Sequence, residues 1–326
     1  MGQKELIRVN HLKKYFNTPK GLLHAVDDVT FQIYEGETLG VVGESGCGKS
    51  TLGRAILRLH EPTSGEVLFG GENILRYNKN QMKEMRTRMQ MIFQDPFSSL
   101  NPRMTVGEAI AEPLLIQGIC SNRDKDGLHR KVRETMELVG LASRLINTYP
   151  HELDGGRRQR IGIGRALVLN PQFIVCDEPV SALDVSIQAQ VLNLMQDLQE
   201  NLKLTYMFIT HDLSVVRHLS TNIAVMYLGQ MVEKAPAKWL FENPLHPYTK
   251  ALLSAVPVAD PDYKMERILL EGELTSPINP GIGCRFAKRC LYATAQCMEK
   301  NVQLTEIESD HFVACHLINK HSQEEE

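Results

Sequence analysis

The residues with the clearest chemistry stand at positions 43–51, where the chain reads Gly-Glu-Ser-Gly-Cys-Gly-Lys-Ser-Thr. This is the G-x-x-x-x-G-K-[ST] pattern of a phosphate-binding loop. Its glycines let backbone N–H groups turn toward phosphate oxygens, and the start of a helix adds the positive end of its dipole. The residues expected to contact the ligand are Gly43, Ser45, Gly46, Cys47, Gly48, Lys49, Ser50 and Thr51. The pattern predicts binding of a nucleoside triphosphate.

The residue types and the surroundings of the loop make this prediction specific. Lys49 would reach the β- and γ-phosphates, and the Ser50 hydroxyl would bind Mg²⁺. An apolar strand at 38–42 leads into the loop and a helix-compatible run at 52–59 follows it. The alternative is a glycine-rich strand–helix turn without a ligand, which does not account for a lysine and a serine at this spacing.

A second carboxylate site is expected near any phosphate loop, and 173–178 supplies it with Phe-Ile-Val-Cys-Asp-Glu. The apolar run predicts a buried strand whose carboxyl end carries the acids, which is where open α/β sheets bind ligands. Asp177 would hold Mg²⁺, and Glu178 would orient or deprotonate the water that attacks the γ-phosphate. Without the phosphate loop, an ordinary strand end with two solvated acids would explain the pair equally well.

The composition limits the classes of function. A chain of 326 residues with 43% hydrophobic content can build about two domains with a real core. The formal net charge of −3 gives no electrostatic reason to expect nucleic acid as a partner. No run of 18 apolar residues and no signal-peptide core are present in the sequence. We expect a soluble cytoplasmic protein that meets membranes only through partners.

The pattern of apolar residues predicts an α/β fold. Short apolar strands alternate with helices after position 170, which argues for a mostly parallel sheet with helices on its faces. A helical insert interrupts this core, and a proline-rich segment with clustered cysteines follows it. The predicted divisions are a core at 1–95 and 161–235, a helical lobe at 96–160 and a C-terminal extension at 236–326.

The order of these motifs resembles the ATP-binding subunit of an ABC transporter over about residues 5 to 235. The resemblance implies the fold of that family's P-loop ATPase core, with an antiparallel β portion beside the parallel sheet. Gln94 looks like the Q-loop glutamine, which contacts Mg²⁺ and senses the γ-phosphate, and His211 looks like the switch histidine that contacts the γ-phosphate. Tyr15 matches the aromatic residue that stacks on adenine, and Ser181 and Asp184 match the D-loop, which crosses to the partner subunit.

Two further stretches narrow the resemblance. Residues 94–102 and 243–253 look like the oligopeptide/dipeptide importers, and 34–43 most resembles the "F" type of their two paired ATPases. This implies a second ABC ATPase, two membrane-spanning permease subunits, an extracytoplasmic peptide-binding protein and a place on the cytoplasmic face of the membrane. A nickel or other small-solute importer of the same group is the alternative. A soluble ABC ATPase of translation or DNA repair usually has two cassettes or a long coiled-coil insertion, and neither is present.

One motif departs from the family pattern. The usual signature Leu-Ser-Gly-Gly-Gln faces the γ-phosphate held by the opposite subunit, whereas 153–157 reads Leu-Asp-Gly-Gly-Arg. Gly155 and Gly156 are kept, but the Asp154 carboxylate cannot donate a hydrogen bond and would repel a phosphate by ~4 kcal/mol at about 4 Å. Arg157 can offset part of this repulsion. We hypothesise that the site on the partner's phosphate loop is impaired; the alternative is that both substitutions are tolerated.

Four cysteines, Cys284, Cys290, Cys297 and Cys315, crowd the end of the chain. In a cytoplasmic protein such a group suggests a metal site rather than disulfides. The wide spacing fits a four-iron four-sulfur cluster better than zinc, whose ribbons usually show tight C-x₂₋₄-C pairs. The segment also resembles a C-terminal cluster motif in some peptide-importer ATPases. Zinc and free thiols remain the alternatives, and a chain that is chiefly a regulatory iron–sulfur protein is a further rival.

Overall fold

The computed structural model describes residues 4–95, 99–121, 124–256, 267–270, 272 and 276–318. The chain divides into two compact units. One comprises Met1–Glu5, Tyr34–Glu37 and Asn73–Phe208, and the other Leu6–Ile33, Thr38–Glu72 and Ile209–Glu326. These units cross the domain boundaries expected from the sequence, so that division stays a prediction. Each unit is described by itself.

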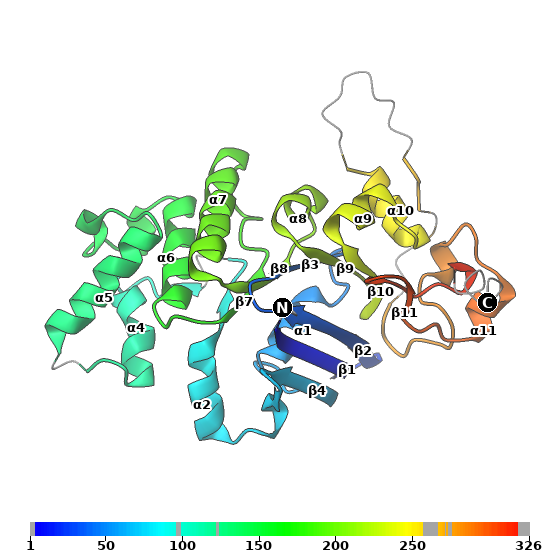
Figure 1. Cartoon of the computed structure of the whole chain (residues 1–326), viewed down its shortest axis with the longest axis horizontal. Coiled ribbons are helices and arrows are strands. Elements are labelled where there is room, and N and C mark those ends of the chain that lie inside the picture. The colour runs from blue at the N-terminus through cyan, green and yellow to red at the C-terminus, as the bar shows by residue number, and fades with distance from the viewer. Residues whose placement is uncertain are drawn as a thin grey trace. The chain divides into compact units, whose positions relative to one another are not determined.

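The second unit carries the phosphate loop and the C-terminal segment (Figure 1). Its elements, each with at least half of its residues in this unit, are β1 (Glu5–Thr18), β2 (Gly21–Tyr34), β3 (Thr38–Val42), α1 (Lys49–Ile56), β4 (Ser64–Phe69), β5 (Glu72–Asn73), α8 (Leu213–Leu219), β9 (Asn222–Tyr227), β10 (Gln230–Pro236), α9 (Ala237–Glu242), α10 (Pro247–Ser254), α11 (Ala295–Glu299), β11 (Thr305–Glu308) and β12 (His311–Val313). A short 3₁₀ turn, Ala287–Arg289, lies between two of the cysteines.

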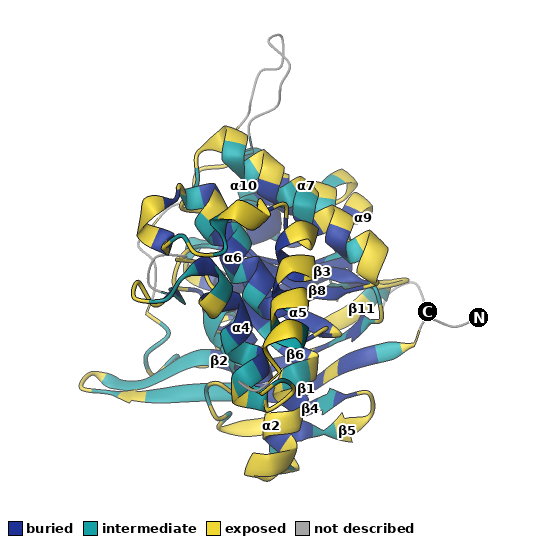
Figure 2. Ribbon diagram, turned by 90° about the vertical axis from the view of Figure 1, so that its left-hand side faces the viewer, coloured by how far each residue is buried: buried dark blue, intermediate teal, exposed yellow. Residues whose placement is uncertain are grey.

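Two sheets organise this unit. Strands β2-β1-β4-β5 form one sheet, in which β1 and β4 pair antiparallel with Ile7 opposite Phe69. The other runs in the order β11-β12-β10-β9-β3, where β3 and β9 are parallel with Val42 opposite Val225. All of β3 is buried, as Figure 2 shows, because its apolar residues face neighbours on both sides. The expected parallel strand thus delivers the chain into the phosphate loop.

The first unit holds the helical lobe and the strand that ends at Asp177. Its elements are α2 (Lys79–Arg88), β6 (Met89–Ile92), α4 (Val106–Gln117), α5 (Lys125–Leu138), α6 (Gly155–Leu167), β7 (Phe173–Asp177), α7 (Val185–Leu202) and β8 (Thr205–Ile209), with 3₁₀ turns Ile74–Arg76, Ser143–Leu145 and Pro150–Glu152. Strands β6 and β7 are parallel, and Ile92 lies opposite Cys176. Their carboxyl ends therefore meet at one edge.

Local sequence signals explain why the lobe is helical. Thr105 caps α4 and forms a capping box with Glu108, and α5 buries Val132, Thr135 and Met136 on one face. Helices α4, α5 and α6 pack on one another (Figure 1). Within the described ranges, no helix combines the length and apolar character that a membrane crossing requires. The predicted lobe begins at 96, and positions 96–98 lie outside the described residues.

Candidate nucleotide-binding site

The phosphate loop has the backbone geometry of an anion cradle. Gly43, Gly46 and Gly48 have φ values of 149°, 77° and 106°, which favour glycine. A Cβ on Gly48 would lie 2.0 Å from the Ala25 carbonyl oxygen, whereas one on Gly46 would meet nothing within 4 Å. Gly48 caps α1 with no side-chain hydrogen bond, so no side chain occupies that cap. The loop therefore fits a triphosphate.

Lys49 is positioned for the phosphates by the loop itself. Its ammonium donates to the carbonyl oxygens of Gly43 at 2.7 Å and Glu44 at 3.0 Å, and its side chain is almost fully buried. Cys47 lies beside it, with its sulfur 3.8 Å from the Lys49 nitrogen. The ammonium is thus held against the backbone of the loop, and its contact with a phosphate stays a prediction.

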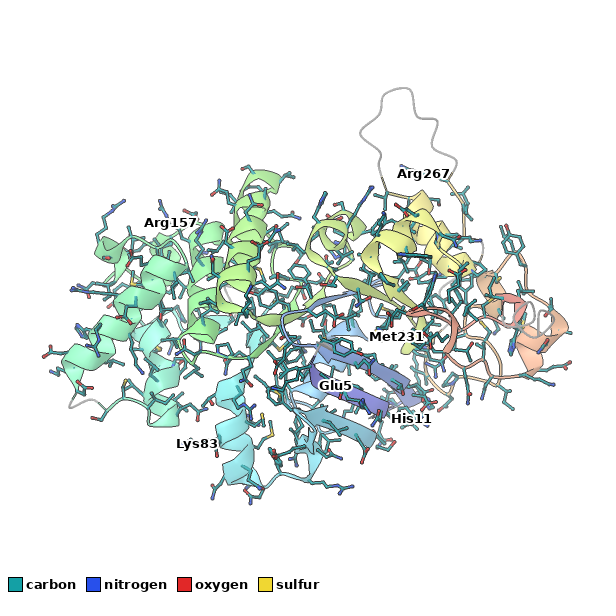
Figure 3. The ribbon with its side chains drawn as sticks, viewed as in Figure 1. Glu5, His11, Lys83, Arg157, Met231 and Arg267 are labelled. Atoms are coloured by element: carbon teal, nitrogen blue, oxygen red, sulfur yellow. The ribbon has the colours of Figure 1, made fainter. Side chains whose placement is uncertain are left out.

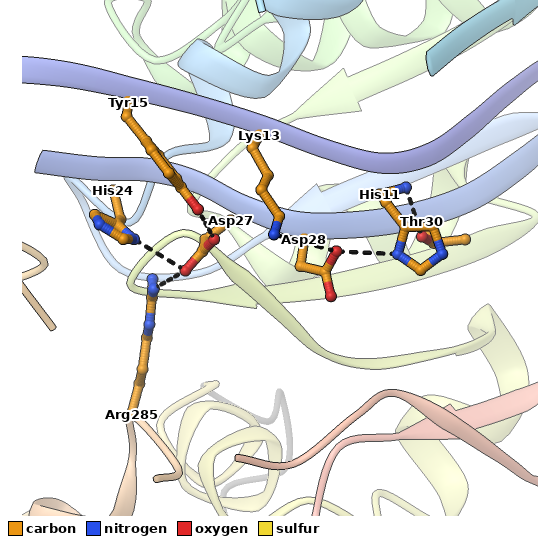
Figure 4. Close-up of polar contacts among 8 residues, drawn as sticks. All are labelled: His11, Lys13, Tyr15, His24, Asp27, Asp28, Thr30 and Arg285. Atoms are coloured by element: carbon orange, nitrogen blue, oxygen red, sulfur yellow. Dashed lines mark hydrogen bonds and ion pairs between the residues drawn. The ribbon is translucent and has the colours of Figure 1, made fainter. Parts of the chain in front are cut away.

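Tyr15 lies in the same unit on β1, in a tight polar group. Its ring stacks on His24 with centroids 3.9 Å apart, and its hydroxyl donates to Asp27 (Figure 4). Burial and the bond to Asp27 raise the pKa of Tyr15, so the hydroxyl stays neutral and remains a donor. His24 covers one face of the ring, so a purine would have to stack on the other.

The first unit brings together two other predicted residues. Gln94 follows β6 and Glu178 follows β7, and the Gln94 amide donates to the Glu178 carboxylate at 3.0 Å. Asp177, the last residue of β7, is fully buried. Glu178 has a φ of 46°, an unusual conformation for a non-glycine residue of the kind that clusters at functional sites. A buried carboxylate beside a bonded Gln–Glu pair suits Mg²⁺ and an ordered water.

The residues predicted to form the D-loop stabilise the turn after Glu178. The Ser181 hydroxyl donates to the Glu178 carbonyl oxygen at 3.1 Å. Asp184 caps α7, and its carboxylate accepts from the Ile187 amide at 3.1 Å. Hydrogen bonds from Ile187 and Ser186 lower the pKa of Asp184. His211 is exposed just after β8 and belongs to the unit of the phosphate loop.

The stretch predicted to be an altered signature begins α6 with a carboxylate. Asp154 is the N-cap, and its carboxylate accepts from the Arg157 amide at 2.8 Å. Its other oxygen lies 3.4 Å from the Arg157 guanidinium, and both side chains are about half exposed; Arg157 points outward in Figure 3. Gly156 is required by packing, because a Cβ there would lie 2.4 Å from a methyl group of Ile187. The helix start is thus already occupied by the chain's own negative charge.

Sequence reasoning missed three side chains that support the phosphate loop and Tyr15. The Tyr248 hydroxyl accepts from the Glu44 amide at 3.0 Å, and Arg289 pairs with the Glu44 carboxylate. Arg285 pairs with Asp27, the partner of Tyr15. Tyr248 lies in a motif that the sequence did indicate, but the arginines could have been noticed only as neighbours of Cys284 and Cys290.

The four cysteines lie in one region of the second unit. Cys284 donates its backbone N–H to the Cys297 carbonyl oxygen at 2.8 Å. Burial raises the pKa of Cys284 to about 11, and the thiols of Cys297, Cys315 and Cys290 add to the rise. In the described part of the chain, however, no group of three or more His, Cys, Asp or Glu side chains could hold a metal ion. The described residues therefore do not support the predicted cluster.

Comparisons with known proteins agree with this site. The family described as ABC transporter matches residues 26–181. The family described as oligopeptide/dipeptide transporter, C-terminal region, matches residues 232–297. Two solved structures share the fold. The ATP-binding cassette MJ0796, bound to ADP and Pi, has a TM-score of 0.65 and 27% identity and covers 71% of this chain and 99% of its own. The cbiO1 protein of Clostridium perfringens has a TM-score of 0.65 and 25% identity, over 74% and 92%.

Curated relatives extend the likeness to the whole chain. The putative oligopeptide transport ATP-binding protein YkfD of Bacillus subtilis is 54% identical over 97% of both chains. The oligopeptide transport ATP-binding proteins AppF and OppF of the same organism are 51% and 58% identical, over 97% and 81% of this chain and 98% and 87% of their own. On this evidence the chain is an ATPase of the ABC transporter family and belongs to its oligopeptide transport ATP-binding proteins.

Proposed function

We propose that this chain hydrolyses ATP on the cytoplasmic face of a membrane to drive import of oligopeptides or dipeptides. The observation that carries the proposal is the pairing of Gln94 with Glu178 at 3.0 Å, in a chain whose phosphate loop is complete. Lys49 would bind the β- and γ-phosphates, and Ser50, Gln94 and Asp177 would hold Mg²⁺. Glu178 would orient or deprotonate the attacking water, and His211 would contact the γ-phosphate. Catalysis would consist of positioning and electrostatics.

We also propose that the chain works with a second, different ABC ATPase. The support is the signature helix, where the Asp154 carboxylate occupies the cap position and pairs with Arg157. In the assembled pair, this chain's phosphate loop would be completed by the partner's intact signature. The site on the partner's loop would be completed by Asp154, Gly155, Gly156 and Arg157, and would hydrolyse ATP slowly. Ser181 and Asp184 would lie at the interface.

Peptides are favoured over nickel or another small solute, because relatives that match nearly the whole chain are named as oligopeptide transport proteins. The chosen solute would be set by two permease subunits and an extracytoplasmic peptide-binding protein. The proposed route for motion to the permeases is the helical lobe around Phe97 to Asn101, of which positions 97 and 98 lie outside the described residues.

A four-iron four-sulfur cluster on Cys284, Cys290, Cys297 and Cys315 is supported by their spacing and by the resemblance of the segment to a cluster motif. The thiol arrangement described above does not favour it, and no step of the proposed mechanism uses it. Iron, acid-labile sulfide and zinc measured on protein purified without oxygen would decide among cluster, zinc and free thiols. About four irons and four sulfides per chain would establish the cluster.

The importer proposal is tested by pulling the chain from its own membranes in mild detergent and identifying the chains that accompany it. Two multi-span subunits and a second ATPase with an intact signature are expected. The recovered complex is then reconstituted, and ATPase stimulation is compared for its binding protein loaded with peptide or with nickel. Recovery of copies of this chain alone would contradict the proposed pair, and stimulation by nickel but not by peptide would contradict the proposed solute.

A further inference from the structure

Two arginines in the cysteine-rich segment reach the nucleotide site from outside the ATPase core. Arg285 directly follows Cys284, and Arg289 directly precedes Cys290. Their side chains are only 8% and 9% exposed, although arginine is rarely buried unless it is paired. Each is paired with a carboxylate beside a predicted ATP contact.

Arg289 holds the phosphate loop. Its guanidinium donates to both oxygens of the Glu44 carboxylate, at 2.9 and 3.2 Å, which is the bidentate geometry that fixes orientation as well as charge. Glu44 is the second residue of the loop, and Lys49 donates to its carbonyl oxygen. The Tyr248 hydroxyl accepts from the amide of the same residue. The C-terminal segment thus grips Glu44 through both its side chain and its backbone.

Arg285 binds the polar group around Tyr15. It donates to the Asp27 carboxylate and to the Leu228 carbonyl oxygen. Asp27 also accepts from the Tyr15 hydroxyl and pairs with His24 at 3.1 Å, and His24 stacks on Tyr15 (Figure 4). Burial would raise the pKa of Asp27, but the bonds to Tyr15 and His24 and the charge of Arg285 outweigh it and lower the pKa. Asp27 is thereby held as a carboxylate that orients the tyrosine.

The segment between the two arginines is itself anchored. Phe286 is almost fully buried and contacts the rings of Tyr227 and Tyr248, with centroids 5.3 and 5.4 Å apart. The turn Ala287–Arg289 then returns the chain toward Glu44. Removal of either arginine would leave its partner carboxylate without a counter-charge, because breaking a buried ion pair leaves an uncompensated charge.

We propose that Arg285 and Arg289 are positioning residues of the ATP site, Arg285 for the base through Asp27 and Tyr15 and Arg289 for the phosphates through Glu44. The C-terminal extension is then part of the nucleotide site rather than an appendage to it. The inference rests on the proposed contact of Tyr15 with the base.

The two roles predict different losses, which a base-free ligand can separate. The full chain with Mg²⁺ is titrated with ATP and with inorganic tripolyphosphate, which has neither base nor sugar. Arg289→Ala should weaken both ligands by a similar factor of about ten, because the lost pair supports the phosphates. Arg285→Ala should weaken ATP by about fivefold and leave tripolyphosphate within about twofold. A merely structural role would produce no such split.

Control variants distinguish a loss of ligand binding from a loss of folding. Lys288→Ala removes the exposed basic side chain between the two arginines and should change neither ligand. Arg285→Lys and Arg289→Lys keep the charge but lose the planar fork, and should recover part of the binding if an alanine variant unfolds. Tyr15→Ala should reproduce the ATP-selective loss of Arg285→Ala.

The failures can be told apart. A wild-type chain that binds no ATP would overturn the proposed function. If ATP binds but Tyr15→Ala has no effect, the base role of Arg285 is wrong. The inference is overturned if the folded arginine variants bind both ligands like the wild type. It is also overturned if Arg285→Ala weakens ATP and tripolyphosphate by the same factor as Arg289→Ala does.

Discussion

Two helices of this chain begin where a phosphate is expected, and they begin differently. Helix α1 starts at Gly48, with no side-chain cap and no acidic residue in its first turn. Helix α6 starts at Asp154, whose carboxylate accepts from the Arg157 amide at 2.8 Å. The amides and dipole of α1 are available for an anion, whereas those of α6 are partly satisfied by the chain's own charge. A glycine-rich helix start is therefore not by itself a phosphate site.

The two regions also differ in their support. The phosphate loop is held from outside the ATPase core by Arg289 and Tyr248, which both bind Glu44. Gly155 and Gly156 instead pack on Leu183 and Ile187, around the D-loop and α7. The first region is thus supported by side chains of the C-terminal extension, and the second by packing against apolar side chains of its own unit.

The largest effect is expected from removing the charge at the phosphate loop. Lys49→Ala should lower ATP hydrolysis by the assembled complex at least about 100-fold, because the developing charge on the γ-phosphate loses its nearest cation. Phosphate release is measured beside Lys83→Ala, which removes an exposed lysine of α2. A loss below about threefold would mean that the partner's site, not this one, does most of the work.

Acid should weaken the support of the phosphate loop. His246 is fully buried, its imidazole nitrogen accepts from the Tyr248 amide at 3.1 Å, and burial lowers its pKa to about 4. The groups that face it are Glu233, which attracts a proton toward it, and the Ala314 backbone; Glu233 also binds buried His311 at 2.8 Å. Because the folded pKa lies below the unfolded value near 6.5, its stabilisation is complete above pH 6.5 and is lost toward pH 4, by ~3 kcal/mol.

Urea unfolding between pH 4 and 7 measures this dependence. His246→Gln should flatten the acid side of the stability curve, whereas His129→Gln, at an exposed position of α5, should leave its slope unchanged. An unchanged slope in His246→Gln would assign the acid sensitivity to other groups.

The packing of the signature helix can be tested within one helix. Gly156→Ala should destabilise by ~1–3 kcal/mol, because its Cβ would lie 2.4 Å from Ile187. Gly162→Ala is the matched control, since nothing lies within 4 Å of its Cβ. That change should stabilise by about 0.5–1 kcal/mol through helix propensity. Equal effects in urea unfolding would remove the packing argument for Gly156.

Sequence predicted the parts of the site that follow from local spacing. The strand at 38–42, the loop at 43–51 and the strand ending at Asp177 all lie where their patterns place them. It could not predict that Asp27 would join Tyr15 to Arg285, because these residues meet only through folding of the C-terminal segment. The cysteine spacing likewise suggested a cluster that the thiol positions do not favour.

The smallest effect separates charge from capping at Asp154. Asparagine and serine both cap helices about as well as aspartate, so Asp154→Asn and Asp154→Ser should change stability by less than about 0.5 kcal/mol. Both remove the negative charge, and Asp154→Ser with Arg157→Gln also restores a donor. The measurement uses a complex in which this chain also carries Lys49→Ala, so that only the site on the partner's phosphate loop hydrolyses ATP. Hydrolysis at that site should rise by a few-fold to about tenfold. The gain is modest because both side chains are half exposed and screened by solvent.

Asp154→Ala is the contrasting variant: it removes charge and cap together, so a rate gain would come with about 1 kcal/mol of lost stability. If Asn, Ser and Ala all leave the rate unchanged, the carboxylate does not hinder phosphate, and the difference between the two helix starts has no catalytic consequence.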